Sequence, residues 1–217
     1  MKKYKAILFD LDGTLTESGI GITKCVQLAL ERMGKPEPDL DILKVFVGPP
    51  LKDQFMAYAG FTGEEADQAI AYFRERYHVT GVYENAVYEG IEDMLKALKE
   101  AGYVLAVASS KPEHLVNKVL EHFHLKHYFT ETVGSEMDGV RSKKSEVVEE
   151  ALLRLGMTED KEHVLMVGDK EHDVFGARAM GLECVAVTWG YGTDEELAAA
   201  APMKTIDHPK ELTEYLM

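Results

Sequence analysis

The feature that most constrains the fold is an alternation, after residue 87, of strand-length apolar runs with helix-length amphipathic segments. The expected strands are 103–108, 129–133, 163–167 and 183–187, and the expected helices are 91–101, 112–123, 145–155 and 173–180. Strands that alternate with helices of this length form parallel sheets with helices on both faces. The sequence therefore predicts an α/β fold with a doubly wound parallel sheet and a short α/β tail at its C-terminus.

A further apolar run, residues 4–9, lies near the N-terminus and is followed by Asp10, Asp12, Gly13 and Thr14. Where a strand ends in a Gly-containing turn, carboxylates on alternate positions can reach the same crevice. Two buried carboxylates disfavour each other's ionisation, and burial disfavours both, unless a metal or a cationic side chain compensates them. The run therefore predicts a buried strand that ends in a functional turn.

Between these two regions the pattern is helical. Helix-type periodicity runs through Val26, Leu30 and Met33, and shorter helical segments are expected at about 40–47, 51–58 and 64–79. Gly and Pro residues separate them, and no strand is expected between about residues 16 and 85. The predicted organisation is an α/β domain of residues 1–15 and 86–217 with a helical insertion at 16–85.

Composition narrows the function. The chain has 217 residues and a formal net charge of −14, which argues against a nucleic acid polymer as a partner but is compatible with a small phosphate ester. No apolar run approaches a membrane span, and the N-terminus lacks a signal-peptide pattern, so a cytoplasmic protein without a membrane partner is expected. Cys25 and Cys184 suggest neither a disulfide framework nor a zinc site. The sequence does not indicate an oligomeric state.

Polar groups follow other predicted strands. Ser109 follows the strand at 103–108, with Ser110 beside it, and Asp169 and Asp173 follow the strand at 163–167. Lys143 and Lys144 open the helix before that strand. Ligands of doubly wound sheets bind at the carboxyl ends of the strands. These groups are therefore expected at one edge of the sheet, together with Asp10 and Asp12.

These residues resemble the four motifs of the haloacid dehalogenase superfamily of phosphohydrolases. The matching positions are Asp10-Leu11-Asp12-Gly13-Thr14, Ser109, Lys144 and Gly168-Asp169 with Asp173. Shorter stretches resemble its phosphoglycolate-phosphatase-like branch, and within it the members called 5′-nucleotidases: Gly21-Ile22-Thr23-Lys24, Gly48-Pro49-Pro50-Leu51, Tyr88-Glu89-Gly90-Ile91, Gly134-Ser135, Asp138-Gly139-Val140-Arg141 and Gly190-Tyr191-Gly192. The resemblance implies a Rossmann-like core with an inserted all-helical cap of type C1.

The resemblance also implies a mechanism. Asp10 would be the nucleophile that forms an aspartyl-phosphate, and Asp12 the acid that protonates the leaving oxygen and then activates water. Mg²⁺ would be the cofactor, held by the Asp10 carboxylate, the Asp12 backbone carbonyl and Asp169. Lys144 and Ser109 would contact the phosphoryl group.

Other positions are assigned less directly. Asp173 is expected to orient Lys144 or a metal-bound water. Ser109 is preferred to Ser110 because it follows the apolar strand immediately, and Lys144 to Lys143 because its spacing to the following valines resembles the family's helix. Further candidates for phosphate or substrate contact are Gly13, Thr14, Ser110, Lys24, Arg74 and Arg76.

The substrate is expected to be a small phosphorylated metabolite. The chain departs from many relatives in having Glu17 where they have aspartate, at the start of the predicted cap. The favoured activity is that of a Mg²⁺-dependent phosphatase of the 5′-nucleotidase type. A phosphoglycolate phosphatase and a sugar phosphomutase of the same superfamily are the alternatives.

Overall fold

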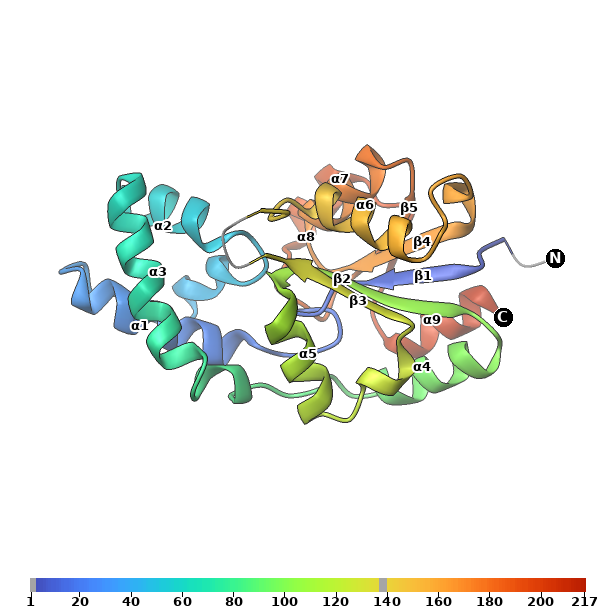
Figure 1. Cartoon of the computed structure of the whole chain (residues 1–217), viewed down its shortest axis with the longest axis horizontal. Helices are drawn as coiled ribbons and strands as arrows, with labels where there is room; N and C mark the ends of the chain where they lie inside the picture. The colour runs from blue at the N-terminus through green and yellow to red at the C-terminus, as the bar shows by residue number, and fades with distance from the viewer. Residues whose placement is uncertain (1–2, 137–139) are drawn as a thin grey trace. The chain divides into compact units, whose positions relative to one another are not determined.

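The computed structural model describes residues 3–136 and 140–217. It divides into two compact units, one formed by Met1–Thr16 and Val87–Met217 and the other by Glu17–Ala86 (Figure 1). The division lies one residue later at each junction than the predicted one. Asp138 and Gly139, which belong to one of the motifs named above, lie outside the described residues.

The first unit contains a six-stranded sheet in the order β3-β2-β1-β4-β5-β6, with every neighbouring pair parallel. Its strands are β1 (Ala6–Phe9), β2 (Val104–Pro112), β3 (Glu131–Ser135), β4 (Val164–Gly168), β5 (Glu183–Val187) and β6 (Lys204–Ile206). Strand β1 lies in the middle, between β2 and β4. The predicted doubly wound parallel sheet is confirmed.

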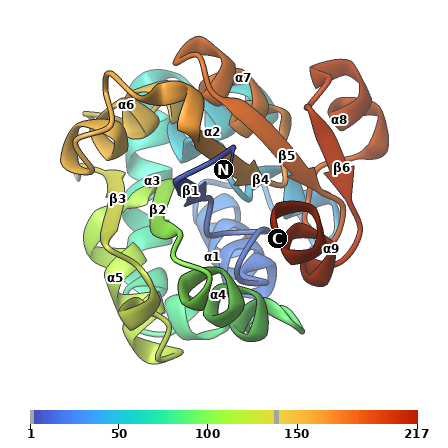
Figure 2. The same ribbon diagram turned by 90° about the vertical axis from the view of Figure 1, so that its right-hand side faces the viewer.

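Helices cover both faces of this sheet. They are α4 (Ile91–Glu100), α5 (Glu113–His122), α6 (Lys144–Arg154), α7 (Glu171–Ala179), α8 (Asp194–Ala200) and α9 (Pro209–Leu216). Helices α6 and α7 lie on one face, and α4, α5 and α9 lie on the other (Figure 2). Leu8, Val148 and Met166 are fully buried between the sheet and the α6/α7 layer. The apolar strand runs therefore form the core, as their composition predicts.

Strand β2 is longer than predicted. The expected strand ended at residue 108, but the extended chain continues to Pro112, which pairs with Ser135 of β3 after a register shift that begins at Ala108. Proline favours an extended conformation in the residue before it, and this keeps Lys111 out of the helix that follows. Ser109 and Lys111, two residues apart on this extended segment, are both buried.

The regular secondary structure of the second unit is entirely helical. It contains α1 (Gly19–Arg32), the 3₁₀ segment η1 (Ile42–Phe46), α2 (Leu51–Ala59), α3 (Gly63–Tyr77) and the 3₁₀ segment η2 (Gly81–Tyr83). Thr62 and Glu65 form a capping box at the start of α3. The rings of Phe46 and Phe55 pack with centroids 4.9 Å apart. The inserted all-helical unit predicted from the sequence is confirmed.

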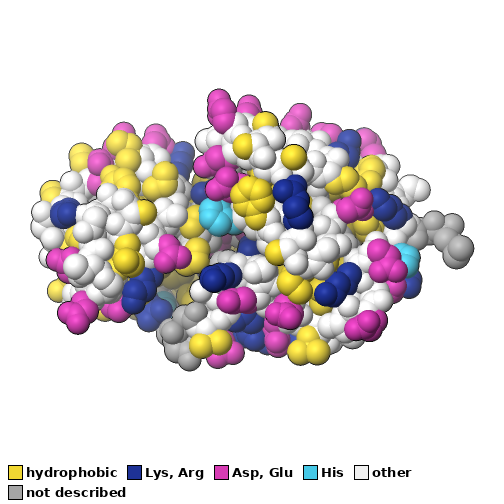
Figure 3. Space-filling model, turned by 90° about the horizontal axis from the view of Figure 1, so that it is seen from above, with side chains coloured by type: hydrophobic (Ala, Val, Ile, Leu, Met, Phe, Trp, Pro, Cys, Tyr) yellow, Lys and Arg dark blue, Asp and Glu magenta, His cyan; other side chains and the backbone are white. Residues whose placement is uncertain are grey.

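Charged side chains of both signs lie on the described surface. On the face drawn in Figure 3, Lys and Arg side chains are interspersed with Asp and Glu side chains. Among the described residues, no helix has both the length and the apolar character that crossing a membrane requires.

Candidate active site at the carboxyl end of the sheet

Three acidic side chains meet where β1 and β4 end. Carboxylate oxygens of Asp10, Asp169 and Asp173 all lie within 4.8 Å of one another. Asp10 is 4% exposed, Asp169 1% and Asp173 2%. Strands β1 and β4 are neighbours in register, so their parallel direction brings residue 10 beside residue 169 although the two are far apart in sequence. The expected meeting of these acids is present in the structure.

Lys144, the first residue of α6, lies among these acids. Its Nζ is 2.6 Å from Asp10 Oδ1 and 2.8 Å from Asp173 Oδ1, and it donates a third contact of 3.1 Å to the Ala108 carbonyl. Lys143, by contrast, is exposed. Burial lowers the pKa of Lys144, but the carboxylates of Asp10 and Asp173 outweigh it and hold the pKa above its ordinary value. Lys144 is therefore a permanent cation beside Asp10.

Asp12 lies apart from this group and has a lysine of its own. The Nζ of Lys111 is 2.7 Å from one Asp12 carboxylate oxygen and 3.0 Å from the other. Both side chains are less than 10% exposed. Lys111 is absent from the residues that the sequence singled out. The signal was its spacing of two from Ser109, which becomes informative only once β2 is known to stay extended beyond residue 108.

The turn after β1 is shaped around Asp169. Gly13 has a φ of +90°, and a Cβ on it would lie 2.2 Å from Asp169 Oδ2. The hydroxyl of Thr14 donates to Asp169 Oδ1 at 3.2 Å, and the Tyr191 backbone N–H donates to Oδ2 at 2.8 Å. The indole of Trp189 donates to the Thr14 carbonyl at 3.0 Å. The loop after β5 therefore holds both the turn and the carboxylate, a role that the sequence did not reveal.

The two serines differ in burial. Ser109 is 2% exposed, and its hydroxyl accepts a weak hydrogen bond of 3.4 Å from the Lys111 backbone N–H. Ser110 is half-buried. Lys111, the residue that contacts Asp12, is buried like Ser109.

The buried charged side chains of the whole site carry an excess of negative charge. Its four buried carboxylates, Asp10, Asp12, Asp169 and Asp173, outnumber its two buried lysines by two. Burial, together with the charge of Asp173, raises the pKa of Asp169 to about 8. Burial also raises the pKa of Asp10 to about 6, although Lys144 opposes the shift. An all-oxygen donor set with this excess of negative charge fits a hard divalent cation such as Mg²⁺.

The predicted substrate residues of the helical insertion lie in the Glu17–Ala86 unit. Lys24 and Arg76 both pair with Glu84, at 2.9 and 2.6 Å. Arg76 also donates to the Cys25 sulfur at 3.2 Å. Arg74 is half-buried near the end of α3. Lys24 and Arg76 thus share one carboxylate partner within their own unit.

The sequence and the fold match known proteins along nearly the whole chain. Residues 7–187 match the family model described as haloacid dehalogenase-like hydrolase. A 5′-nucleotidase of Pseudomonas aeruginosa is 45% identical over 200 residues, which are 92% of this chain and 90% of that protein. The tyrosine-protein kinase PtkA of Mycobacterium tuberculosis is 40% identical over 86% of this chain, which spans only 62% of that protein's length.

More distant relatives and solved structures agree with this match. A phosphoglycolate phosphatase of Aliivibrio fischeri is 31% identical over 96% of this chain and 94% of its own length. The crystal structure of a predicted phosphatase from Clostridium acetobutylicum superposes with a TM-score of 0.95. It is 43% identical, and the match covers 98% of this chain and 97% of that one.

Proposed function

Since the chain belongs to the haloacid dehalogenase-like hydrolase family and is a phosphomonoester hydrolase, we propose that it is a Mg²⁺-dependent phosphatase of nucleoside 5′-monophosphates. The observation that carries the mechanism is the buried Asp10 carboxylate with Lys144 at 2.6 Å, in one cluster with Asp169 and Asp173. The carboxylate can act as a nucleophile, and the cation beside it can bind and orient the phosphoryl group that is attacked.

The proposed reaction has two displacements at phosphorus. First, an Asp10 oxygen bonds to phosphorus as the bond to the leaving oxygen breaks, and Asp12 gives that oxygen its proton. Second, Asp12 takes a proton from water, whose oxygen attacks the phosphorus and releases Asp10 with inorganic phosphate. Asp12 ends each turnover in its starting protonation state, so the two steps balance.

The remaining groups stabilise charge. Lys144 would contact the phosphoryl oxygens as well as Asp10, and Ser109 would donate a hydrogen bond to the same group. Asp173, 2.8 Å from the Lys144 ammonium, would hold it in place. Mg²⁺ bound by the carboxylates of Asp10 and Asp169 and the backbone carbonyl of Asp12 would neutralise charge between an anionic nucleophile and an anionic substrate.

Substrate selection is assigned to less central positions. Gly13 and Thr14, in the turn beside Asp169, and Ser110 are proposed to contact the phosphate. The helical unit is proposed to act as the cap that excludes water and contacts the leaving group. Lys24, Arg74 and Arg76 are its candidate contacts, but a substrate would compete with Glu84 for Lys24 and Arg76.

The choice of nucleotides over other esters is supported by the relative of 45% identity that is named a 5′-nucleotidase. Phosphoglycolate is the second candidate substrate, supported by the relative of 31% identity. A sugar phosphomutase would retain the same aspartates but pass the phosphoryl group to a sugar hydroxyl instead of water. A cytoplasmic enzyme acting on a small phosphorylated metabolite remains the expectation.

The experiment that tests this proposal is a phosphate-release assay with and without Mg²⁺. The panel contains nucleoside 5′-monophosphates, phosphoglycolate, pyrophosphate and sugar phosphates. Mg²⁺-dependent release with the highest kcat/KM on nucleotides is the expected result. A preference for phosphoglycolate would replace the proposed substrate, and full activity in excess chelator would overturn the metal assignment. Phosphorylation of Asp10 by a sugar bisphosphate without phosphate release would identify a mutase.

A further inference from the structure

We propose that Lys111 is a positioning residue, which holds the Asp12 carboxylate in the orientation that proton transfer to the leaving oxygen requires. This inference rests on the proposed function, because it assigns Lys111 a role through the acid/base Asp12. It extends that function by giving each of the two aspartates a lysine of its own, Lys144 for Asp10 and Lys111 for Asp12.

The contact between Lys111 and Asp12 has the geometry of an orienting pair. One ammonium group lies within hydrogen-bond distance of both carboxylate oxygens, at 2.7 and 3.0 Å. Contacts to both oxygens fix the rotation of the carboxylate as well as its position. The exposed fractions of the two side chains are 5% for Lys111 and 7% for Asp12, so water does not compete freely for the pair. The Asp12 carboxylate is therefore held in one orientation.

The backbone that carries Lys111 is itself fixed by β3. A Cβ on Gly134 would lie 2.4 Å from the Lys111 carbonyl oxygen and 2.5 Å from the Glu113 nitrogen. Only a residue without a side chain allows the two strands to approach this closely. The next residue, Pro112, pairs with Ser135 of β3. Lys111 thus projects from a segment with little freedom to move.

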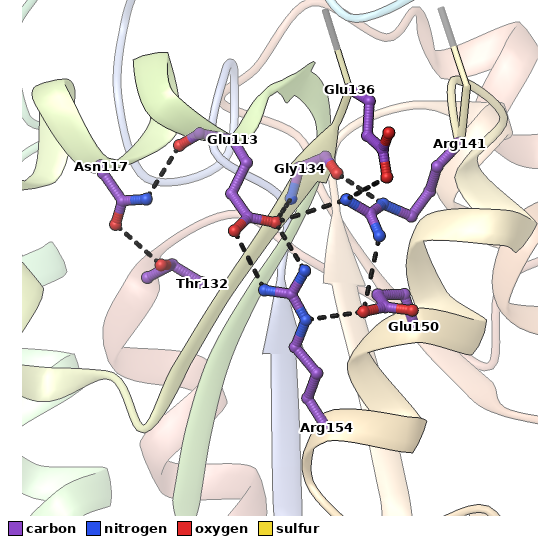
Figure 4. A network of polar contacts seen from close by, with 8 residues as sticks. All are labelled: Glu113, Asn117, Thr132, Gly134, Glu136, Arg141, Glu150 and Arg154. Carbon is purple, nitrogen blue, oxygen red and sulfur yellow. Dashed lines mark hydrogen bonds and ion pairs between the residues drawn. The ribbon is translucent and has the colours of Figure 1, made fainter.

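A polar network behind this segment strengthens it (Figure 4). The Glu113 carboxylate receives both terminal nitrogens of Arg154, at 3.0 and 2.9 Å. Arg154 also contacts Glu150 on α6 at 2.7 Å. Arg141 donates to the Gly134 carbonyl at 2.9 Å and lies 3.6 Å from Glu113. The network thereby joins the start of α5, which follows β2 directly, to β3 and to helix α6, whose first residue is Lys144.

The two lysines contact different aspartates, and the proposed reaction gives those aspartates different tasks. Asp10 must attack phosphorus while Asp12, two residues away, must face the leaving oxygen and later the attacking water. Lys144 contacts the carboxylates of Asp10 and Asp173, whereas Lys111 contacts that of Asp12. Without Lys111, Asp12 would lose the buried cation that holds its carboxylate. Its share of productive orientations would fall, and with it the rate of proton transfer.

The test compares Lys111→Met with the wild type on two kinds of ester, using the holoenzyme with Mg²⁺. An alkyl ester needs its leaving oxygen protonated, whereas p-nitrophenolate leaves with little help from an acid. We expect kcat/KM to fall about 10- to 100-fold on the best alkyl phosphomonoester of the panel, and much less on p-nitrophenyl phosphate. Lys111→Arg, which keeps the charge, should recover part of the loss. Lys143→Met, which removes an exposed lysine, should leave both rates unchanged.

A double-mutant cycle gives a second readout that does not depend on the aryl ester. Since Lys111 acts through Asp12, adding Lys111→Met to Asp12→Asn should lower kcat/KM little further. Equal losses on the two esters, or losses that multiply in the double mutant, would overturn the positioning role. If the wild type itself releases no phosphate, the proposed function fails. If the wild type is active and Lys111→Met matches it on both esters, only the Lys111 inference fails.

Discussion

At the scale of single residues, the proposed mechanism depends on Asp10. We expect Asp10→Asn to lower kcat by at least about 10³-fold, because an amide is a poor nucleophile and cannot form the acyl-phosphate. The measurement is phosphate release under saturating substrate and Mg²⁺, with circular dichroism to confirm folding. Appreciable turnover by this variant would contradict the covalent mechanism.

The two adjacent lysines give a matched pair of variants. Lys144→Met leaves Asp10 and Asp173 without their shared cation, so we expect a loss of about 10²- to 10³-fold in kcat/KM. Breaking a buried ion pair on one side also destabilises a fold by about 3–5 kcal/mol, which urea denaturation measures. Lys143→Met, at the exposed neighbour, should change neither quantity. The reverse pattern would move the active lysine to Lys143.

What the sequence could predict at this scale follows from local pattern. Apolar strands ending in Asp10, Ser109 and Asp169 are visible along the chain, and the parallel sheet then brings them to one edge. The partner of Asp12 is not visible in this way. Lys111 was hidden because the apolar run ends at residue 108, whereas pairing with Ser135 keeps the chain extended to Pro112. Strand length here is decided by a neighbour far away in sequence, which no local propensity records.

At the scale of elements, the turn after β1 packs against Asp169, one of the proposed metal ligands. Gly13→Ala places a Cβ in a backbone conformation with φ of +90° and against Asp169 Oδ2. We expect a loss of stability of about 1–3 kcal/mol and a weakened response to Mg²⁺, because Asp169 must move. Thermal denaturation with and without Mg²⁺ measures both effects.

A second glycine provides the control for this turn. Gly102 has a φ of +85°, but a Cβ on it would meet nothing within 4 Å. Gly102→Ala should therefore show the backbone penalty of about 1–2 kcal/mol alone and retain the full Mg²⁺ response. Equal Mg²⁺ responses in the two variants would show that the clash with Asp169 is absorbed elsewhere.

At the scale of the whole molecule, the excess of buried carboxylates predicts how stability depends on pH and metal. The pKa of Asp169 rises from 3.8 to about 8 on folding, and that of Asp10 from 3.8 to about 6. At a pH between the unfolded and folded pKa values, the folded protein binds protons that the unfolded chain does not. The free energy of unfolding without metal therefore falls as the pH rises from about 4 to 8. We expect the metal-free Tm to decrease over this range.

Mg²⁺ should reverse this trend, because the cation favours the ionised carboxylates and protons compete with it at low pH. The Tm gained with Mg²⁺ is therefore expected to be larger at pH 8 than at pH 5.5, as differential scanning fluorimetry can measure. Asp169→Asn should lose most of this gain. A gain independent of pH, or unchanged in that variant, would place the metal elsewhere.

The position of β1 in the sheet also has a consequence for how the chain is made. Residues 6–9 are synthesised before both of their partners, 104–107 on one side and 164–167 on the other. Strand β1 therefore cannot complete its pairing until both of its partner strands have been synthesised. The Glu17–Ala86 unit is one continuous stretch of chain, so its internal contacts do not depend on segments that are synthesised later. We expect nascent chains that stall between residues 108 and 163 to be prone to aggregation, because one edge of an apolar strand is still open.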